Sequence, residues 1–148
     1  MKAAYYEAQG SARDVLKVGE LPTPEPGSDE VRVRIHVSGL NPTDVKARTG
    51  FSAEMPYPRI IPHQDGAGVI DAVGANVPPD RLGERVWVYE AQYGRATGTA
   101  AEFVVVPARQ AVHLPDTTSF EVGASLGIPA LTAHRCLFSD GSLKGRRV

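Results

Sequence analysis

The sequence has only one cysteine, Cys136, in 148 residues. A single cysteine excludes an intrachain disulfide framework and a four-cysteine structural zinc lobe, and it suits a reducing compartment. Long hydrophobic runs are also absent, because no stretch approaches the roughly 20 apolar residues of a membrane-spanning helix. The first residues, Met1 to Tyr5, lack the apolar core of a secretion signal. We therefore expect a cytoplasmic protein without a membrane partner.

An excess of charge is missing as well. Sixteen basic side chains stand against seventeen acidic ones, and the net charge is -1. This balance disfavours nucleic acid as a main partner, since nucleic-acid-binding surfaces are strongly basic. The four histidines also lack the i, i+3 or i+4 spacing of a helical metal-ligand pair. Composition therefore leaves an ordinary soluble domain with 42% hydrophobic residues.

Fifteen glycines and twelve prolines separate short apolar runs, a pattern typical of short strands joined by tight turns. The clearest strand covers 31–37, where valine and isoleucine alternate with arginine and histidine. We predict a mainly β fold. Further strands are predicted over residues 2–7, 15–21, 68–73, 85–89, 101–106 and 111–114.

Helices are predicted at the middle and at the end of the chain. Asn41 and Pro42 suit the N-cap and first position of a helix that ends at Thr49, before Gly50. A capping-box spacing at 118–121 predicts a helix to about residue 126, and a further helix is predicted over 129–138. Residues 142–148 indicate a turn followed by the first residue of a new strand.

Three segments carry a family resemblance: 38–44, 63–68 and 126–129. They resemble the three stretches that supply the catalytic zinc ligands of medium-chain alcohol dehydrogenases. In that family a Cys stands where Asn41 is, a His where Gln64 is, and a Cys or acidic ligand near Ile128. Two amides and an alkyl side chain cannot supply a zinc tetrahedron. The sequence thus resembles the zinc-free branch, the quinone oxidoreductase or zeta-crystallin type, and we expect no zinc.

The resemblance covers essentially the whole chain. Gly83–Trp87, Gly98–Phe103 and Leu126–Ala133 are similar to further landmarks of this family. The resemblance implies a mainly β, barrel-like GroES-like catalytic domain with short helices over 1–124. Over 125–148 it implies the connecting helix and the start of a missing dinucleotide-binding Rossmann domain. Relatives are often dimers through that domain, so a homodimer of the full-length protein is implied as well.

The implied activity is NADPH-dependent, zinc-independent hydride transfer to a small-molecule quinone or enone. The present chain alone is expected to be inactive, because the domain that binds most of the NADPH is absent from it. The alternative is a naturally short GroES-like binding or assembly module. Against that alternative, the predicted helix over 129–138 would expose an apolar stripe.

Five residues are candidates for the site. The amide of Asn41, a catalytic and cofactor-binding candidate, can both donate and accept hydrogen bonds, although it equally suits the helix cap. Lys46 replaces a tyrosine of the family and is a catalytic candidate for oxyanion stabilisation, or else a solvated surface lysine. Asp44, Gln64 and Thr132 are cofactor-binding candidates. Asp44 also suits the first turn of a helix, and Thr132 a bond back to its own helix.

Neighbouring residues have supporting interpretations. Asp65 is expected to support the loop that carries Gln64, or to accept hydrogen bonds from Arg48 or Arg59. Phe51 and Tyr57 are candidates for an aromatic wall of the substrate cleft. The run 66–68, Gly-Ala-Gly, looks like a phosphate-binding turn, but a β pattern continues after it and no third glycine follows. Close backbone approach within a strand is the better interpretation.

Overall fold

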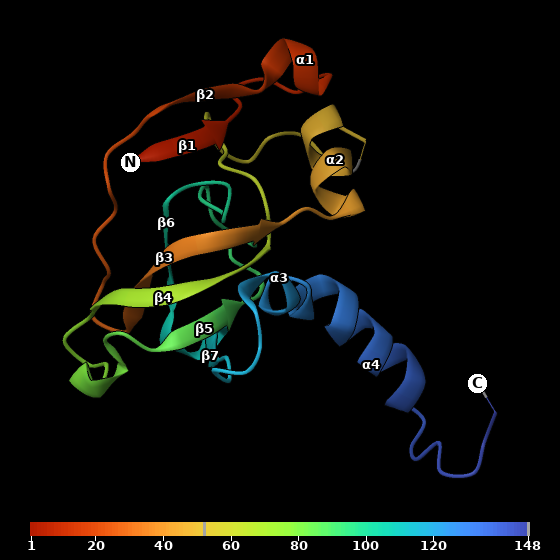
Figure 1. Cartoon of the computed structure of the whole chain (residues 1–148). Helices are drawn as coiled ribbons and strands as arrows, with labels where there is room; N and C mark the ends of the chain where they lie inside the picture. The colour runs from red at the N-terminus through yellow and green to blue at the C-terminus, as the bar shows by residue number, and fades with distance from the viewer. Residues whose placement is uncertain (52, 148) are drawn as a thin grey trace.

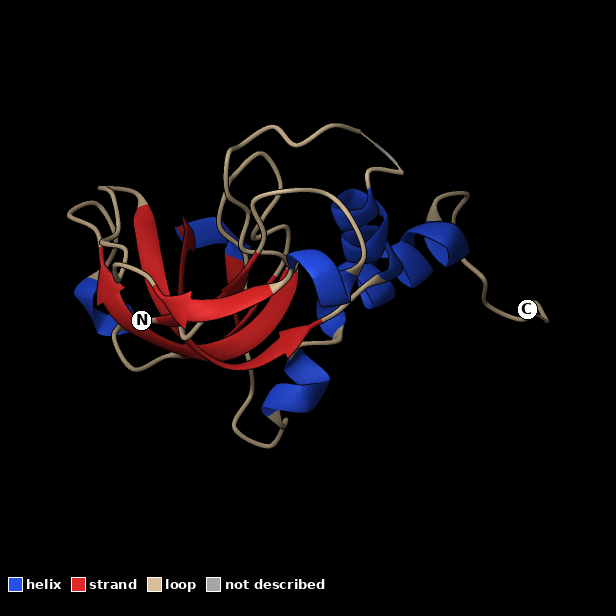
Figure 2. Cartoon of the chain, turned by 90° about the horizontal axis from the view of Figure 1, so that it is seen from above, coloured by secondary structure: helices blue, strands red, loops and turns tan. Residues whose placement is uncertain are grey.

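Two antiparallel sheets form the body of the protein in the computed structural model, which describes residues 1–51 and 53–147. The larger sheet has the order β6-β3-β4-β5-β7, and β1 pairs with β2 beside it (Figure 1). Figure 2 shows that the strands of the sheet are strongly curved. The strands are β1 Lys2–Tyr5, β2 Lys17–Glu20, β3 Glu30–Gly39, β4 Asp65–Val73, β5 Arg85–Val88, β6 Phe103–Pro107 and β7 Ala111–His113. The prediction of a mainly β fold is confirmed.

The core lies on one face of the larger sheet and follows from the alternation in β3. Val31 and Val33 are fully buried, whereas Arg32 between them reaches the other face and donates to Asp71. Alternation of this kind places every second side chain on the same face of a strand. The neighbouring strands add apolar side chains to the same cluster, including Ile70, Val86, Val88, Val104 and Val106.

The helices are short and lie around the sheets. They are α1 Ala12–Val15, α2 Pro42–Thr49, α3 Phe120–Gly123 and α4 Leu131–Phe138, with single 3-10 turns at Pro79–Arg81 and Ala108–Gln110. Helix α2 matches the predicted bounds, because Pro42 occupies its first turn and Gly50 ends it with a φ of 78°. Helix α1 was not predicted: its last residue, Val15, was assigned to a strand that in fact begins at Lys17.

The C-terminal helices differ from the prediction in two places. The N-cap of α3 is Ser119, whose hydroxyl accepts from the Val122 N–H, so the predicted capping box began one residue too early. A helical turn over Leu126–Ala130 then precedes α4, and Gly127 departs from helical geometry with a ψ of −111°. Val148, the first residue of the predicted new strand, lies outside the described residues.

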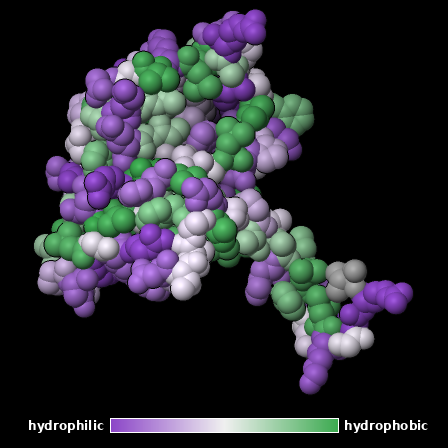
Figure 3. Space-filling view, viewed as in Figure 1, coloured by the Kyte–Doolittle hydropathy of each residue, from purple (hydrophilic) through white to green (hydrophobic). Residues whose placement is uncertain are grey.

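Helix α4 projects away from the sheets (Figure 1). None of its residues is buried, and Leu131, Leu137 and Phe138 are exposed. Figure 3 shows hydrophobic residues gathered along this arm. The apolar stripe predicted for this region is therefore present, and nothing in the described part of the chain covers it.

Gly68 permits a close approach between β4 and β3. A Cβ atom at Gly68 would lie 2.0 Å from the carbonyl oxygen of Arg34, well inside van der Waals contact. Gly66 and Gly68 both belong to β4 rather than to a turn before a helix. The close-approach interpretation of these glycines is thus supported by the packing of the strands.

We predict that Gly68→Ala lowers the free energy of unfolding by about 2 kcal/mol or more, because backbone has to move. Gly19→Ala is the matched control, since its Cβ would lie 3.5 Å from the Tyr5 ring, at ordinary contact distance. The control should change stability by only about 0.5 kcal/mol. Urea unfolding followed by circular dichroism measures both values. Equal stability of the two variants would contradict this account of Gly68.

Candidate functional site

Asp65 joins the segments that resemble zinc-ligand stretches. It is the first residue of β4 and is completely buried. Its Oδ2 atom accepts a hydrogen bond from Nδ2 of Asn41 at 2.7 Å and another from the backbone N–H of Ile128 at 2.9 Å. One carboxylate oxygen therefore holds together two of the three segments, and the third segment supplies the carboxylate itself.

Gly127 makes room for this carboxylate. A Cβ atom on Gly127 would lie 2.1 Å from Oδ1 of Asp65, so any larger residue would displace the carboxylate. The Oδ1 atom is buried and has no hydrogen-bond partner among the described residues. The non-helical backbone of Gly127 thus presents the Ile128 N–H to Asp65 at close range.

Asn41 is the N-cap residue of α2 and also donates a hydrogen bond to Asp65. Its backbone is extended ahead of α2, its carbonyl oxygen accepts from the Asp44 N–H at 3.0 Å, and its own N–H donates to the Asp44 carboxylate at 2.7 Å. Asn41 and Asp44 are both buried. Because a carboxylate can only accept, Asn41 must direct its amide nitrogen to Asp65. The amide oxygen is then directed to the first turn of α2, where Asn41 and Asp44 form a capping box, and its second lone pair is the part of Asn41 that can meet a ligand.

Two buried carboxylates shape the electrostatics of this region. Burial raises the pKa of Asp65, and the hydrogen bonds from Asn41 and Ile128 oppose that shift while the nearby Asp44 adds to it. Burial likewise raises the pKa of Asp44, against the effect of the Asn41 N–H. Both groups are desolvated, so the hydrogen bonds that hold them are stronger than at the surface.

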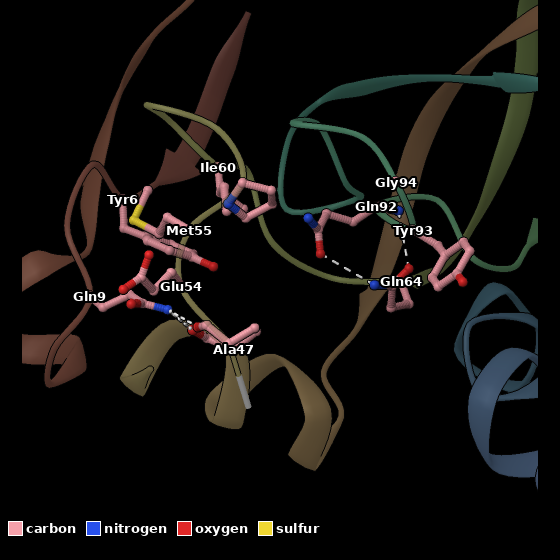
Figure 4. Close-up of a pocket in the computed structure, with 12 residues that line it drawn as sticks. Tyr6, Gln9, Ala47, Glu54, Met55, Ile60, Gln64, Gln92, Tyr93 and Gly94 are labelled. Carbon is pink, nitrogen blue, oxygen red and sulfur yellow. Dashed lines mark hydrogen bonds between the residues drawn. The ribbon is translucent and has the colours of Figure 1, made fainter. Parts of the chain in front are cut away.

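Gln64 supports a neighbouring loop rather than lying free. Its Nε2 donates to Oε1 of Gln92 at 3.2 Å, and its Oε1 accepts from the Gln92 N–H at 3.2 Å. Gln92 in turn donates to the carbonyl oxygen of Arg95 at 2.9 Å. This amide pair, drawn with dashed lines in Figure 4, fixes the loop over residues 90–95.

A cavity of about 410 Å³ lies beside this loop. Figure 4 shows Tyr6, Met55 and Ile60 on one side of it and the Gln64–Gln92 pair with Tyr93 on the other. Tyr93 is 73% exposed. Nothing in the local sequence pattern marks four of these lining residues as site residues: Tyr6, Met55, Gln92 and Tyr93.

The two aromatic residues proposed for a cleft wall take different places. The Tyr57 hydroxyl donates to the carbonyl oxygen of Gly94 at 2.6 Å, next to Tyr93, and so helps to position the loop. Phe51 is 79% exposed and does not line the cavity. Tyr93 is therefore the aromatic side chain best placed to face a flat ligand.

The other predicted site residues lie apart from Asp65. Lys46 is exposed on α2, and Thr132 is exposed on α4, where it lines a separate hollow with Ile128. The expected hydrogen bonds from Arg48 and Arg59 to Asp65 are not formed. Arg48 instead donates to the carbonyl oxygen of Gly10, and Arg59 donates to the Glu7 carboxylate. The sequence shows that these two side chains are charged, but it does not show which acceptors they contact.

Metal-ligand geometry is missing from the described residues. Over 1–51 and 53–147, no group of three or more His, Cys, Asp or Glu side chains is placed to hold a metal ion. Nor does this part of the chain contain a helix that is long and apolar enough to cross a membrane.

We predict that Asp65→Ala lowers the free energy of unfolding by about 2 to 4 kcal/mol, because two buried donors lose their acceptor. Asp65→Asn is the matched control, since an amide oxygen can still accept from Asn41 and Ile128. Its loss should be less than half as large. Chemical unfolding measures both, and an alanine variant as stable as the asparagine variant would show that the two hydrogen bonds do not matter.

Comparisons with known proteins identify the family of the chain. Residues 27–116 match the alcohol dehydrogenase GroES-like domain family. The quinone oxidoreductase of Mus musculus is 36% identical over 126 residues, and the synaptic vesicle membrane protein VAT-1 homolog of Rattus norvegicus is 34% identical over 133 residues. These matches cover 84% and 88% of this chain but only 37% and 32% of the relatives.

Solved structures extend the comparison. The quinone oxidoreductase of Pseudomonas syringae pv. Tomato DC3000 has a TM-score of 0.85 at 30% identity, over 95% of this chain and 42% of the other. A mycobacterial protein complexed with NADPH has a TM-score of 0.82 at 29% identity, over 94% of this chain and 41% of the other. The chain thus spans well under half the length of these relatives. It belongs to the alcohol dehydrogenase GroES-like domain family and is similar to the quinone oxidoreductases of the medium-chain dehydrogenase/reductase superfamily.

Proposed function

We propose that the chain is the catalytic-domain portion of an NADPH-dependent, zinc-independent oxidoreductase that transfers hydride to a quinone or an enone. Residues 1–124 form the catalytic domain in this proposal, and 125–148 lead into a dinucleotide-binding domain. The observation that carries the proposal is the Asp65 junction. It joins by hydrogen bonds the three segments that resemble the zinc-ligand stretches.

The donor chemistry at the junction supports zinc independence. The groups present are the Asn41 amide, the Asp65 carboxylate and the Ile128 N–H. Zinc needs several thiolate, imidazole or carboxylate ligands around one point. Here there is a single carboxylate, whose Oδ2 atom accepts from two protein N–H groups and whose Oδ1 atom lies against Gly127.

Only some of the predicted cofactor-binding residues have side-chain groups left for a ligand. When bound, NADPH supplies the hydride through its nicotinamide ring. The Asn41 oxygen can accept a hydrogen bond from a ribose hydroxyl, and the exposed hydroxyl of Thr132 remains available on α4. Asp44 and Gln64 have a structural role instead, because their side chains are already hydrogen-bonded to Asn41 and Gln92. This division supports one wall of a cofactor cleft, with the other wall on a further domain.

The cavity beside the 90–95 loop suits the acceptor. Its volume of about 410 Å³ falls within the range of small-molecule sites, about 300 to 1,000 Å³. Tyr93 offers a ring face to a flat quinone or enone, and the Gln64–Gln92 pair keeps that loop in place. Lys46 remains a catalytic candidate in the proposal only if its exposed side chain turns toward bound substrate.

A naturally short binding or assembly module is the second candidate. The exposed residues of α4 argue against it, because a stable monomer rarely leaves such a stripe uncovered. The much greater length of the relatives supports a further domain that covers α4. A gene whose reading frame ends at Val148, with a stable monomeric product, would favour the short module.

We predict that the full-length protein oxidises NADPH when benzoquinone or a simple enone is supplied, and that a zinc chelator does not reduce the rate. The 148-residue chain alone should show neither activity nor tight NADPH binding. Absorbance of NADPH and titration calorimetry measure these properties. Robust NADPH affinity of the short chain would contradict the division into two domains, and inhibition by the chelator would contradict zinc independence.

We predict that Tyr93→Ala raises the KM for benzoquinone about three- to tenfold, the usual value of an aromatic contact, and leaves the KM for NADPH unchanged. Phe51→Ala is the matched control, because Phe51 is equally exposed and lies outside the cavity. Steady-state kinetics of the full-length protein measure both constants. An equal effect of the two variants would remove Tyr93 from the acceptor site.

A further inference from the structure

A further hollow lies beside α2. Its volume is about 350 Å³, and it lies between α1, α2 and the start of β1. Its walls are mostly apolar and include Ala12, Leu16, Leu40, Val45 and Pro62. Three polar residues, Asp44, Arg48 and His63, also line it.

A chain of hydroxyl groups fixes the orientation of His63. The Thr99 hydroxyl lies 2.5 Å from the carbonyl oxygen of Asp65, and Ser38 Oγ lies 2.8 Å from both Thr99 Oγ1 and His63 Nδ1. A carbonyl oxygen can only accept, so Thr99 donates its single hydrogen to Asp65. Ser38 must then donate to Thr99. Its oxygen is left to accept a hydrogen from Nδ1 of His63.

This chain determines which nitrogen of His63 is free. Neutral His63 carries its hydrogen on Nδ1, so Nε2 has the lone pair. Within the described residues Nε2 has no hydrogen-bond partner, although His63 lines the hollow. Burial lowers the pKa of His63, and nearby Asp65 only partly opposes that shift, so the ring stays neutral at neutral pH.

The other polar side chains of the hollow each have a hydrogen-bond partner in the protein. The Asp44 carboxylate accepts from the Asn41 N–H, and the Arg48 guanidinium donates to the carbonyl oxygen of Gly10. Within the described residues, Nε2 of His63 is thus an unpartnered acceptor at this hollow, beside the second oxygen of Asp44 and the remaining N–H groups of Arg48. His63 also has a left-handed backbone with a φ of 81°, which few residues other than glycine adopt. Strain of this kind concentrates at functional positions.

We propose that this hollow binds a compact apolar molecule with one hydroxyl group, of the phenol class. Its ring would lie among Leu16, Leu40 and Val45, and its O–H would donate to Nε2 of His63. The volume of about 350 Å³ is at the small end of ligand sites, which favours a single ring. An acceptor without a hydrogen pairs with a hydroxyl donor and not with an ether oxygen, so Nε2 favours a phenol over its methyl ether.

Phenol titrated into the 148-residue chain tests the proposal by NMR, with anisole as the matched ligand that keeps the ring but lacks the donor. We expect phenol to shift the Nε2 resonance of His63 and the methyl resonances of Leu16 and Val45. Anisole should bind about tenfold more weakly, because Nε2 then stays unpaired. Long-range nitrogen-proton spectra of the free protein should show the Nδ1–H tautomer.

Two variants sharpen the test. His63→Leu should lose the preference for phenol over anisole, whereas His134→Leu, an exposed histidine on α4, should keep it. If His63→Leu does not fold, the comparison of the two ligands on the unchanged chain still decides. Equal affinity for phenol and anisole, no shift at the hollow, or an Nε2–H tautomer of His63 would each overturn the proposal.

Discussion

The buried carboxylate of Asp65 is the interaction on which the site depends. It belongs to the central strand β4, and it reaches the N-cap of α2 through Asn41 and the helical turn after α3 through Ile128. These segments are separated by 24 and 63 residues from Asp65. A metal ion does the same work in the zinc enzymes that the sequence resembles, because it ties distant segments to one point. Here the segments are held together by one carboxylate oxygen that accepts from two N–H donors.

The hydrogen bonds of Asp65 fix the geometry of the site, but burial of this carboxylate lowers the stability of the fold. Burial raises the pKa of Asp65 in the folded chain above its value in the unfolded chain. A carboxyl group with a raised pKa contributes stability below about pH 4, its ordinary value, and loses that contribution as the pH rises through the folded value. Asp44 is shifted in the same direction. As the pH rises and the two groups ionise, they therefore weaken the fold, while their hydrogen bonds specify where Asn41 and Ile128 lie.

Local patterns in the sequence were enough to predict strand β3 and helix α2. The alternation over 31–37 predicted β3, and Pro42 with Gly50 predicted both ends of α2, because these signals act within a few residues. The start of α3 was wrong by one residue because Thr118 and Ser119 are both hydroxyl residues with similar capping ability. Local chemistry alone does not choose between adjacent candidates of this kind.

The site was less predictable because its contacts join distant parts of the chain through groups that residue identity does not reveal. Ile128 takes part through its backbone N–H, so its alkyl side chain gave no signal. Gln64 pairs with Gln92, and two amides carry no charge pattern that would indicate a partner. Arg48 and Arg59 carry the charge opposite to that of Asp65, but the donors that Asp65 accepts from are uncharged. Uncharged donors can pair with a buried carboxylate without the cost of desolvating a second charge. The topology of the sheet chooses such partners, and only the folded structure shows them.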